Sequence, residues 1–343
     1  MQRRAAVWLV GRRTARVTSR PKARRGTIPR VALRVAQTEP PNGLQLLAAA
    51  VMRSWIRSGW RGSTGGPLLL ARYIPLFHAL PVALPDRQHV YVDLRDGLSH
   101  HLLGSSPWTH APIERSEQEI MRRVVRRGDV IFDIGAHMGL HTVLLSALTG
   151  DTGAVHAFEV NPWRRPSLRE TIRHLTNATL HEFGLADRID RTTLYVPVDQ
   201  TMASLADWTK GRAGTVTEVA ADVQTLDAVI SSGRAPLPDF VKCDVEGAEM
   251  AVFKGGATLF DREDAPLVLF EADARSAKAF GVDIAASTRV LRGFARAAYS
   301  FLWVRPDAMV RHIDLPGGEW ERFNLIAVPA ARRDRVSGLQ LLP

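Results

Sequence analysis

The feature of the sequence that most constrains its fold is residues 128–159, GDVIFDIGAHMGLHTVLLSALTGDTGAVHAFE. A short apolar run ends at Asp133, Gly135 and Gly139 follow it, and a helical stretch then leads to a second apolar run that ends at Glu159. This order predicts a strand, a glycine turn, a helix and a second strand. A right-handed βαβ unit places such a turn at the carboxyl edge of a parallel sheet, where open α/β folds bind nucleotides.

The spacing of the two glycines excludes one large class of nucleotide-binding protein. Dinucleotide enzymes use G-x-G-x-x-G for the tight turn around the pyrophosphate, whereas here three residues separate Gly135 from Gly139. Asp133 at the strand end would also repel a pyrophosphate. An acidic lining instead suits a cationic ligand without phosphate, and S-adenosylmethionine, with its sulfonium and α-ammonium groups, is such a ligand.

Three acids at the ends of successive predicted strands take natural roles toward that ligand. We expect Asp133 to face the methionine ammonium directly or through water, Glu159 to hold the ribose hydroxyls, and Asp187 to accept from the adenine amino group. Each acid has an alternative role as the cap of a helix or turn. The glycine turn adds three further positions to the predicted cofactor site: Gly135, His137 and Gly139.

A second group of charged residues, KCDVEG at 242–247, follows another predicted strand. At the carboxyl edge it would lie close to the methyl group that is transferred. Asp244 or Glu246 would accept the proton of an acceptor hydroxyl, or the two carboxylates would hold a divalent metal that acidifies it. We expect Glu249 to cap or solvate the following helix, and Cys243 to point into the core.

The formal charge of +10 is concentrated at the N-terminus. Residues 1–36 contain ten arginines, Lys22 and no acid, which leaves 34 of the 45 basic residues against 35 acids elsewhere. Such a segment is typical of a disordered extension, a transit peptide or a basic arm that contacts phosphates, and an upstream misassigned start is a further alternative. The segment lacks the pattern of a signal peptide, and Cys243 is the single cysteine, so a cytoplasmic protein is expected.

The chain divides into four parts by composition. We expect a basic, disordered tail over residues 1–43, an N-terminal helical and β extension over 44–111, the ligand-binding domain over 112–332, and a C-terminal tail over 333–343. In the extension, residues 44–60 predict a helix that packs against the body; a membrane-surface helix is the alternative. The four prolines of residues 67–85 exclude a simple spanning helix, so no transmembrane segment is expected.

Local patterns at the two ends of the domain complete the prediction. HVYVDL (89–94) predicts a strand, with a possible return strand in SHHLLG (99–104) after a turn. A helix is predicted through 276–297. The last two β-like runs, 299–304 and 323–329, have little helix between them, which predicts an antiparallel pair at the end of a mostly parallel sheet.

Five motifs in this order resemble the FkbM family of methyltransferases: DVIFDIGAHMGLHT, AFEVNP, LDAV, FVKCDVEGAEMAVFKGG and LVLFEAD. The resemblance covers roughly residues 112–273. It implies a Rossmann-like class I methyltransferase fold, with a mostly parallel seven-stranded sheet, an antiparallel terminal strand and the N-terminal extension. It also implies S-adenosylmethionine as the donor, and O-methylation of a hydroxyl on a sugar or polyketide-type natural product.

The resemblance assigns roles residue by residue. The positions that match cofactor-binding positions are Asp133, Gly135 and Glu159, and those that match the acid–glycine motif are Asp244, Glu246 and Gly247. Two residues depart from the family pattern: Val160 stands where proline is usual after the ribose-binding acid, and His141 stands where an aromatic residue is common.

The predicted function is therefore S-adenosylmethionine-dependent methylation of a hydroxylated small molecule, with no nucleic-acid partner. Two alternatives remain open at this point. The basic tail favours a nucleic-acid methyltransferase, although enzymes that methylate base amino groups often carry an N/D-P-P-aromatic loop where DVEG stands here. The other alternative is a catalytically silent module that keeps the fold and binds the cofactor.

Overall fold

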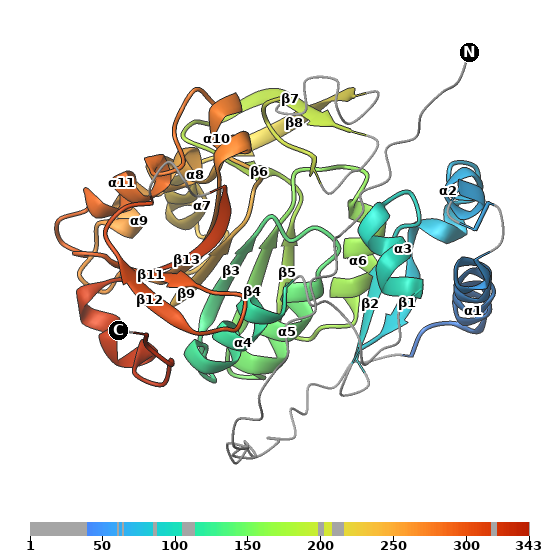
Figure 1. Cartoon of the computed structure of the whole chain (residues 1–343), viewed down its shortest axis with the longest axis horizontal. Helices are drawn as coiled ribbons and strands as arrows, with labels where there is room; N and C mark the ends of the chain where they lie inside the picture. Colours follow the sequence, from blue (N-terminus) through green and yellow to red (C-terminus); the bar gives the residue numbers. More distant parts are fainter. Residues whose placement is uncertain are drawn as a thin grey trace, which may run out of the picture. The chain divides into compact units, whose positions relative to one another are not determined.

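The computed structural model describes residues 40–59, 62–63, 65–84, 88–104, 114–197, 202–207, 216–316 and 321–342. Its centre is an eight-stranded sheet in the order β12-β11-β13-β10-β9-β3-β4-β5 (Figure 1). The predicted disorder of residues 1–39 lies outside the described residues. The strands of this sheet are β3 (Val130–Ile134), β4 (Ala154–Phe158), β5 (Ala178–His181), β9 (Phe240–Cys243), β10 (Leu267–Asp273), β11 (Ser300–Val304), β12 (Val310–Ile313) and β13 (Arg322–Val328).

The strand directions follow the pattern expected from the sequence. β5, β4, β3, β9 and β10 are parallel neighbours, and β13 pairs antiparallel with both β10 and β11. The predicted antiparallel ending is thus confirmed, and β12, antiparallel to β11, adds an eighth strand to the expected seven. β12 arises in residues 305–322, a stretch that the sequence analysis leaves as a loop.

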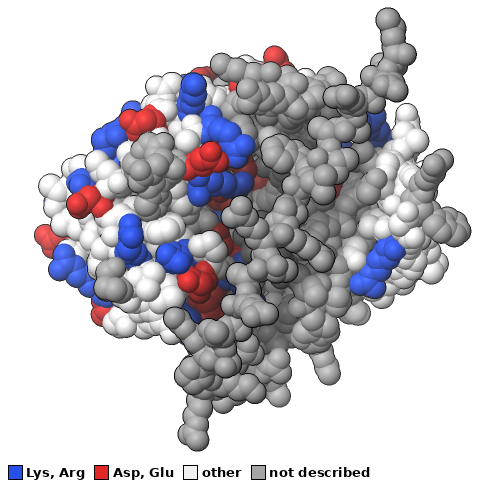
Figure 2. Space-filling view, viewed as in Figure 1, with Lys and Arg blue, Asp and Glu red and all other residues white. Residues whose placement is uncertain are grey.

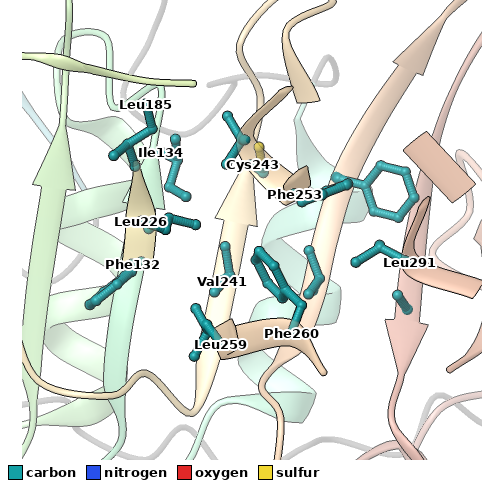
Figure 3. Close-up of a cluster of buried hydrophobic side chains, with 14 of the residues drawn as sticks. Phe132, Ile134, Leu185, Leu226, Val241, Cys243, Phe253, Leu259, Phe260 and Leu291 are labelled. Carbon is teal, nitrogen blue, oxygen red and sulfur yellow. The ribbon is translucent and has the colours of Figure 1, made fainter. Parts of the chain in front are cut away.

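Helices cover both faces of the sheet, which explains why its central strands are apolar throughout. One face packs on α4 (Arg115–Val124), α5 (Leu140–Thr149) and α6 (Arg165–Arg173). The other packs on α7 (Leu226–Ser231), α8 (Glu249–Gly255), α9 (Ala257–Phe260) and α11 (Ala286–Arg292). Side chains alternate between the faces along β3: Ile131 points to the first and Phe132 to the second. Figure 3 shows the second face, where Cys243 lies among aromatic and aliphatic side chains as predicted.

The N-terminal extension has an apolar core of its own. Its elements are α1 (Gly43–Ser58), α2 (Gly65–Ala71), the 3-10 turn η1 (Pro75–His78), β1 (Leu80–Ala83), β2 (His89–Val92) and α3 (Gly97–Gly104). The predicted return strand at 99–104 is wrong, because these residues form α3 and β2 pairs instead with the upstream β1. Asp96 explains why a helix forms here. Its carboxylate accepts from the amide and the hydroxyl of Ser99, so Asp96 caps the N-terminus of α3. α1 packs on α3 through Arg53, whose Nε donates to the Leu103 carbonyl.

A small second sheet stands beside the main one, in the order β6-β8-β7. It consists of β6 (Gly184–Leu185), β7 (Asp190–Val196) and β8 (Thr217–Gln224). Between β7 and β8, Ser204 returns to β7 and bridges Tyr195, and its hydroxyl donates to the Glu246 carbonyl at 2.7 Å. The small sheet therefore holds the 202–205 segment against the carboxyl edge of the main sheet.

Two stretches near the C-terminus differ from the sequence analysis. The helix expected through 276–297 is divided into α10 (Ala274–Ala279) and α11, because Gly281 has a φ of 72° and ends the first segment. The residues expected to form a C-terminal tail pack on the domain through the 3-10 segment η4 (Ala330–Val336): the buried Arg335 forms a bidentate ion pair with Asp129 at 2.7 and 2.8 Å. No helix among the described residues is long and apolar enough to cross a membrane.

Candidate active site

A cavity of about 580 Å³ lies at the carboxyl edge of β3, β4 and β9. This position follows from topology, because the ends of parallel strands meet at one edge of the sheet. Its wall includes Gly135 and His137 after β3, Glu159 after β4, and Asp244 and Glu246 after β9. The structure thus brings together five of the eight residues predicted for the site.

Gly135 lets the first two strand-end loops approach each other. Its φ is 80°, and a Cβ at this position would lie 1.8 Å from the carbonyl oxygen of Asp244. Any side chain would therefore collide with backbone and strain the left-handed conformation. The amides of Gly135 and Ala136 both donate to the Phe158 carbonyl at 3.0 Å, which fixes the turn against β4.

Glu159 is held by the backbone on both sides. One of its carboxylate oxygens accepts from the His137 amide at 2.8 Å and the other accepts from the Asn161 amide at 2.7 Å. Burial raises the pKa of Glu159, and these amides and Arg164 work against that rise. Each carboxylate oxygen keeps a second lone pair for a ligand hydroxyl. The fixed, cavity-facing carboxylate fits the ribose of S-adenosylmethionine.

Asp133 and Gly139 lie behind the cavity wall and not in it. Asp133 is fully buried on the α5 side of β3, where it accepts from the Thr142 hydroxyl at 2.6 Å. Its Oδ1 lacks a hydrogen-bond partner among the described residues and lies 3.8 Å from Lys242 Nζ. Gly139 has a φ of 89° and faces α6, where a Cβ would lie 2.9 Å from a Thr171 methyl. Gly139 thus serves helix packing, and Asp133 reaches a ligand only through an intermediary.

Asp187 is the predicted residue that the structure keeps apart from the site. Its side chain is 41% exposed and forms an ion pair with Arg188 at 3.2 Å, away from the cavity wall. The same segment contributes Gly184 and Leu185 to the wall, together with Leu194 from β7. This end of the cavity is apolar and suits the flat face of an adenine ring.

Lys242 contacts both the loop that follows β3 and the loop that follows β9. Its side chain is buried, and Nζ lies 3.3 Å from Asp244 Oδ2 while it also donates to the Gly135 carbonyl at 3.3 Å. Burial opposes the charge of Lys242, but Asp244 and Asp133 outweigh this effect and raise the pKa of the ammonium. Burial likewise opposes ionisation of Asp244, and Lys242 and Arg322 outweigh it, so the pKa of Asp244 is lowered.

A three-carboxylate cluster extends from Asp244 across the next strand. Oxygens of Asp244, Glu246 and Glu271 lie within 4.8 Å of one another, and Arg322 of β13 forms an ion pair with Glu271. Burial and the charge of Asp244 raise the pKa of Glu246 to about 8 and that of Glu271 to about 9. Asp244 is therefore the most acidic member of the cluster.

The sequence analysis missed two members of this site, Glu271 and Arg322. Glu271 ends a buried apolar run as Asp133 and Glu159 do, so the same strand-end signal was present. Arg322 gave no such signal, because it begins a strand. It reaches the carboxyl edge because β13 is antiparallel to β10 and pairs Arg322 with Asp273.

Glu249 and Cys243 have structural roles. Glu249 Oε1 accepts from the amides of Val245 and Gly247 at 3.0 and 3.3 Å, so it closes the DVEG loop and is not solvated. Cys243 is fully buried, and this burial raises the pKa of its thiol well above the ordinary value. A thiol in this state is a poor nucleophile.

The N-terminal extension contributes to the cavity wall through α3, and Asp96 before this helix pairs with Arg164 of the wall. Arg164 is 1% exposed, and its Nη1 lies 3.2 Å from Asp96 Oδ2. Burial and the charge of Arg164 lower the pKa of His137 to about 3, so this imidazole is neutral. His101 of α3 also lines the cavity, and His141 Nε2 lies 3.5 Å from Glu114 Oε2. His110 lies outside the described residues.

Strand order and site together define a class of protein. A mostly parallel sheet in which β13 inserts antiparallel between β10 and β11 is the Rossmann-like fold of class I methyltransferases, as predicted. Residues 133–300, just under half of the chain, match the model of the methyltransferase FkbM domain. This part of the chain is therefore similar to the FkbM domain of methyltransferases.

Similar proteins agree with this assignment. The chain is 28% identical over 147 residues to the hexuronic acid methyltransferase AglP of Haloferax volcanii. That match covers 41% of this chain and 56% of AglP, so the chain spans little more than half of that relative's length.

Two solved structures resemble the chain at low similarity. A precorrin-6y C5,15-methyltransferase from Geobacter metallireducens has 13% identity and a TM-score of 0.35, over 63% of this chain and 88% of that one. An S-adenosylmethionine-dependent O-methyltransferase from Thermotoga maritima has 10% identity and a TM-score of 0.35, over 74% and 78%. The fold assignment rests on the strand order described above.

Proposed function

We propose that the protein is an S-adenosylmethionine-dependent O-methyltransferase that acts on a hydroxyl of a small molecule, with a sugar as the most fitting acceptor. The observation that carries this proposal is the position of Asp244. Its carboxylate lines the cavity, next to the Gly135 turn, and is held there by Lys242 at 3.3 Å. The match to a protein named as a hexuronic acid methyltransferase supports a sugar acceptor.

The donor fits the β3–β4 side of the cavity. S-adenosylmethionine, when bound, supplies the methyl group from a cationic sulfonium. Glu159 would accept hydrogen bonds from the ribose hydroxyls, and the apolar end at Leu185 and Leu194 would hold the adenine. The Gly135 turn brings backbone close to the methionine part of the donor, and Asp133 contributes through Lys242 or water.

The acceptor fits the β9–β10 side. As the oxygen–carbon bond forms and the sulfur–carbon bond breaks, the hydroxyl proton must leave, and Asp244 is the ionised group placed to accept it. Lys242 orients that carboxylate, and Glu246, which burial keeps protonated, would donate a hydrogen bond to the acceptor. Methyl transfer is an in-line displacement, so placement of the oxygen against the methyl carbon supplies most of the catalysis.

A divalent metal is the second way to activate the hydroxyl. Asp244, Glu246 and Glu271 offer hard oxygen donors that suit Mg²⁺ or Ca²⁺. Arg322 already neutralises part of the charge on Glu271, which favours a metal-free base. Activity that survives dialysis against EDTA would support the base, and activity that is lost and restored by Mg²⁺ would support the metal.

Two arginines make an acidic sugar the best candidate acceptor. Arg275 and Arg322 both line the cavity, and their side chains are 65% and 56% exposed, so each is accessible to a ligand carboxylate. Arginine binds carboxylates through two parallel hydrogen bonds. A hexuronic acid presents such a carboxylate beside several hydroxyls.

The test is a methyl-transfer assay with the purified protein, labelled S-adenosylmethionine, and paired hexuronic acids and neutral hexoses. We expect labelled product from the acid at a lower KM than from the neutral sugar, with the label on a sugar oxygen. Transfer to RNA that falls steeply with salt would favour a nucleic-acid methyltransferase. Donor binding in calorimetry without transfer to any acceptor would favour a silent module.

A further inference from the structure

The outward face of α1 is apolar. Leu44, Leu47 and Val51 are 63%, 62% and 51% exposed, and their spacing of three and four residues places them on one side of the helix. The adjacent side is also apolar, since Ala48 and Met52 are buried against the core of the extension. A surface helix normally turns charged residues to solvent, and α1 has no acid in its sixteen residues.

α2 and the turn after it extend this apolar surface. Leu69 is 54% exposed and Tyr73 is 78% exposed. α2 lies against α1, because a Cβ at Gly66 would meet the Trp55 ring at 2.5 Å. α1 and α2 stand at the right margin of Figure 1. The outer apolar face is defined here by Leu44, Leu47, Val51, Leu69 and Tyr73.

The sequence that leads into and includes α1 and α2 is strongly basic. Residues 1–85 contain 15 basic residues and one acid, Glu39, which leaves 30 of the 45 basic residues and 34 of the 35 acids for the rest of the chain. Among the described residues of this part are Arg53, Arg57 and Arg72. In the space-filling view, the described residues at this margin are white and blue (Figure 2).

We propose that α1 and α2 dock the protein on an anionic lipid surface, with α1 lying in the plane of the membrane interface. An exposed apolar helix within a segment that has 15 basic residues and one acid binds such surfaces by apolar insertion and electrostatic attraction together. A second copy of the chain is a poorer occupant, because a two-fold interface would bring two like-charged extensions together. Neutral or acid-rich partners would leave either the leucines or the arginines unmatched.

The docking face is one helix away from the cavity. α1 packs on α3 through Arg53 and Arg57, which donate to the Leu103 and Gly104 carbonyls at 3.2 and 2.8 Å. Gly97, Leu98 and His101 of α3 line the cavity. Docking through α1 would therefore hold the cavity beside the lipid headgroups. This inference does not depend on the identity of the acceptor.

The test is co-sedimentation of the full chain with vesicles of phosphatidylcholine alone or mixed with phosphatidylglycerol. The variant L44S/L47S/V51S removes the outward apolar stripe of α1 and leaves every arginine in place. The matched control, I189S/L237S, removes exposed apolar side chains that are 69% and 43% exposed elsewhere on the chain. Thermal unfolding followed by circular dichroism checks that both variants are folded.

We expect the unmodified chain and the control to bind the anionic vesicles, and the triple variant to bind them about tenfold more weakly. Neutral vesicles should bind the unmodified chain less, and added salt should weaken its binding to the anionic ones. Equal binding by the triple variant would overturn the proposal and assign membrane binding to the basic residues alone. Absence of vesicle binding, or a dimer in light scattering that the triple variant dissociates, would overturn it as well.

Discussion

The two sides of the cavity satisfy their charged groups in different ways. On the β3–β4 side, Glu159 is held by the backbone amides of His137 and Asn161, both within the strand-end loops themselves. On the β9–β10 side, Asp244 and Glu271 are balanced by the side chains of Lys242 and Arg322, and Arg322 comes from a strand 51 residues beyond its partner.

We relate this difference to the two proposed roles of the cavity: donor binding on the β3–β4 side and proton transfer on the β9–β10 side. Backbone amides are fixed by the fold and carry no net charge, so Glu159 keeps free lone pairs for the hydroxyls of the proposed donor. Carboxylates this close oppose one another's ionisation, so the β9–β10 side combines Asp244, whose pKa is lowered, with Glu246 and Glu271, whose pKa values are raised to about 8 and about 9. Perturbed carboxylates of this kind are what proton transfer at neutral pH needs.

The largest effect is expected from removing the proposed base. Asp244→Asn should lower kcat by about 10²–10⁴-fold, because it leaves no ionised carboxylate to accept the proton. The Kd of S-adenosylmethionine should change little, since the donor side is separate. The measurement is steady-state kinetics beside calorimetry of the donor, with Asp187→Asn as the matched control. Equal kcat for the two variants would remove Asp244 from the chemistry.

The next largest effect is expected from enlarging Gly135, where the loops after β3 and β9 approach each other. Gly135→Ala places a Cβ 1.8 Å from the Asp244 carbonyl at a φ of 80°, so we expect the free energy of unfolding to fall by about 2–4 kcal/mol. Gly43→Ala, where nothing lies within 4 Å, is the control. Chemical denaturation of both variants gives the comparison. A shared small change would show that the loops can separate without cost.

A pH profile sharpens the role of Lys242. This ammonium holds the pKa of Asp244 low, so Lys242→Met should raise the pKa of Asp244 and move the acid limb of kcat/KM about one unit or more toward higher pH. Lys254→Met, on α8 outside the cavity, should leave the profile in place. An unshifted acid limb in Lys242→Met would mean that another group titrates there.

The smallest effect concerns the core beneath the donor side. His181 stacks on Phe158 and its Nε2 lies 3.0 Å from Nδ1 of His156; burial and His156 lower its pKa to about 4. The unfolded chain therefore takes up a proton first as pH falls, so stability is full above about pH 6.5 and declines between about 6.5 and 4. We expect a loss of about 2–3 kcal/mol in this window.

The measurement is urea unfolding at a series of pH values. His181→Phe, which keeps the stacked ring, should flatten the decline. A similar slope in this variant would assign the pH dependence to other groups.

Local patterns placed one part of the cavity wall for a physical reason. The apolar runs, the glycine spacing and the strand-end acids lie within 32 residues, and parallel topology brings their ends together. Gly135, His137 and Glu159 were therefore placed in the wall from the sequence. The side chain of Asp133, by contrast, leaves β3 on the buried face, and Asp187, which follows the short β6, is exposed outside the cavity wall.

The acceptor side and the extension were less accessible to sequence reasoning. Arg322 reaches Glu271 only because β13 inserts antiparallel between β10 and β11. Asp96 and Arg164 meet across two parts of the chain that share no motif. Residues 99–104 are helical, and the helix is capped by Asp96. The alternating pattern of residues 89–94 instead favoured a hairpin with a return strand at 99–104.

The sequence by itself determined the sheet's parallel core, the glycine turn, the position of Glu159 in the cavity wall and the DVEG loop. Each of these is encoded within one strand–turn–helix unit. Tertiary structure alone decided which acids face the cavity and which are ionised. Both depend on side chains that arrive from distant strands, on burial, and on the face of the strand from which each carboxylate leaves. The residues 128–159 thus fix where a ligand binds, while Lys242, Glu271 and Arg322 fix what chemistry the opposite wall can perform.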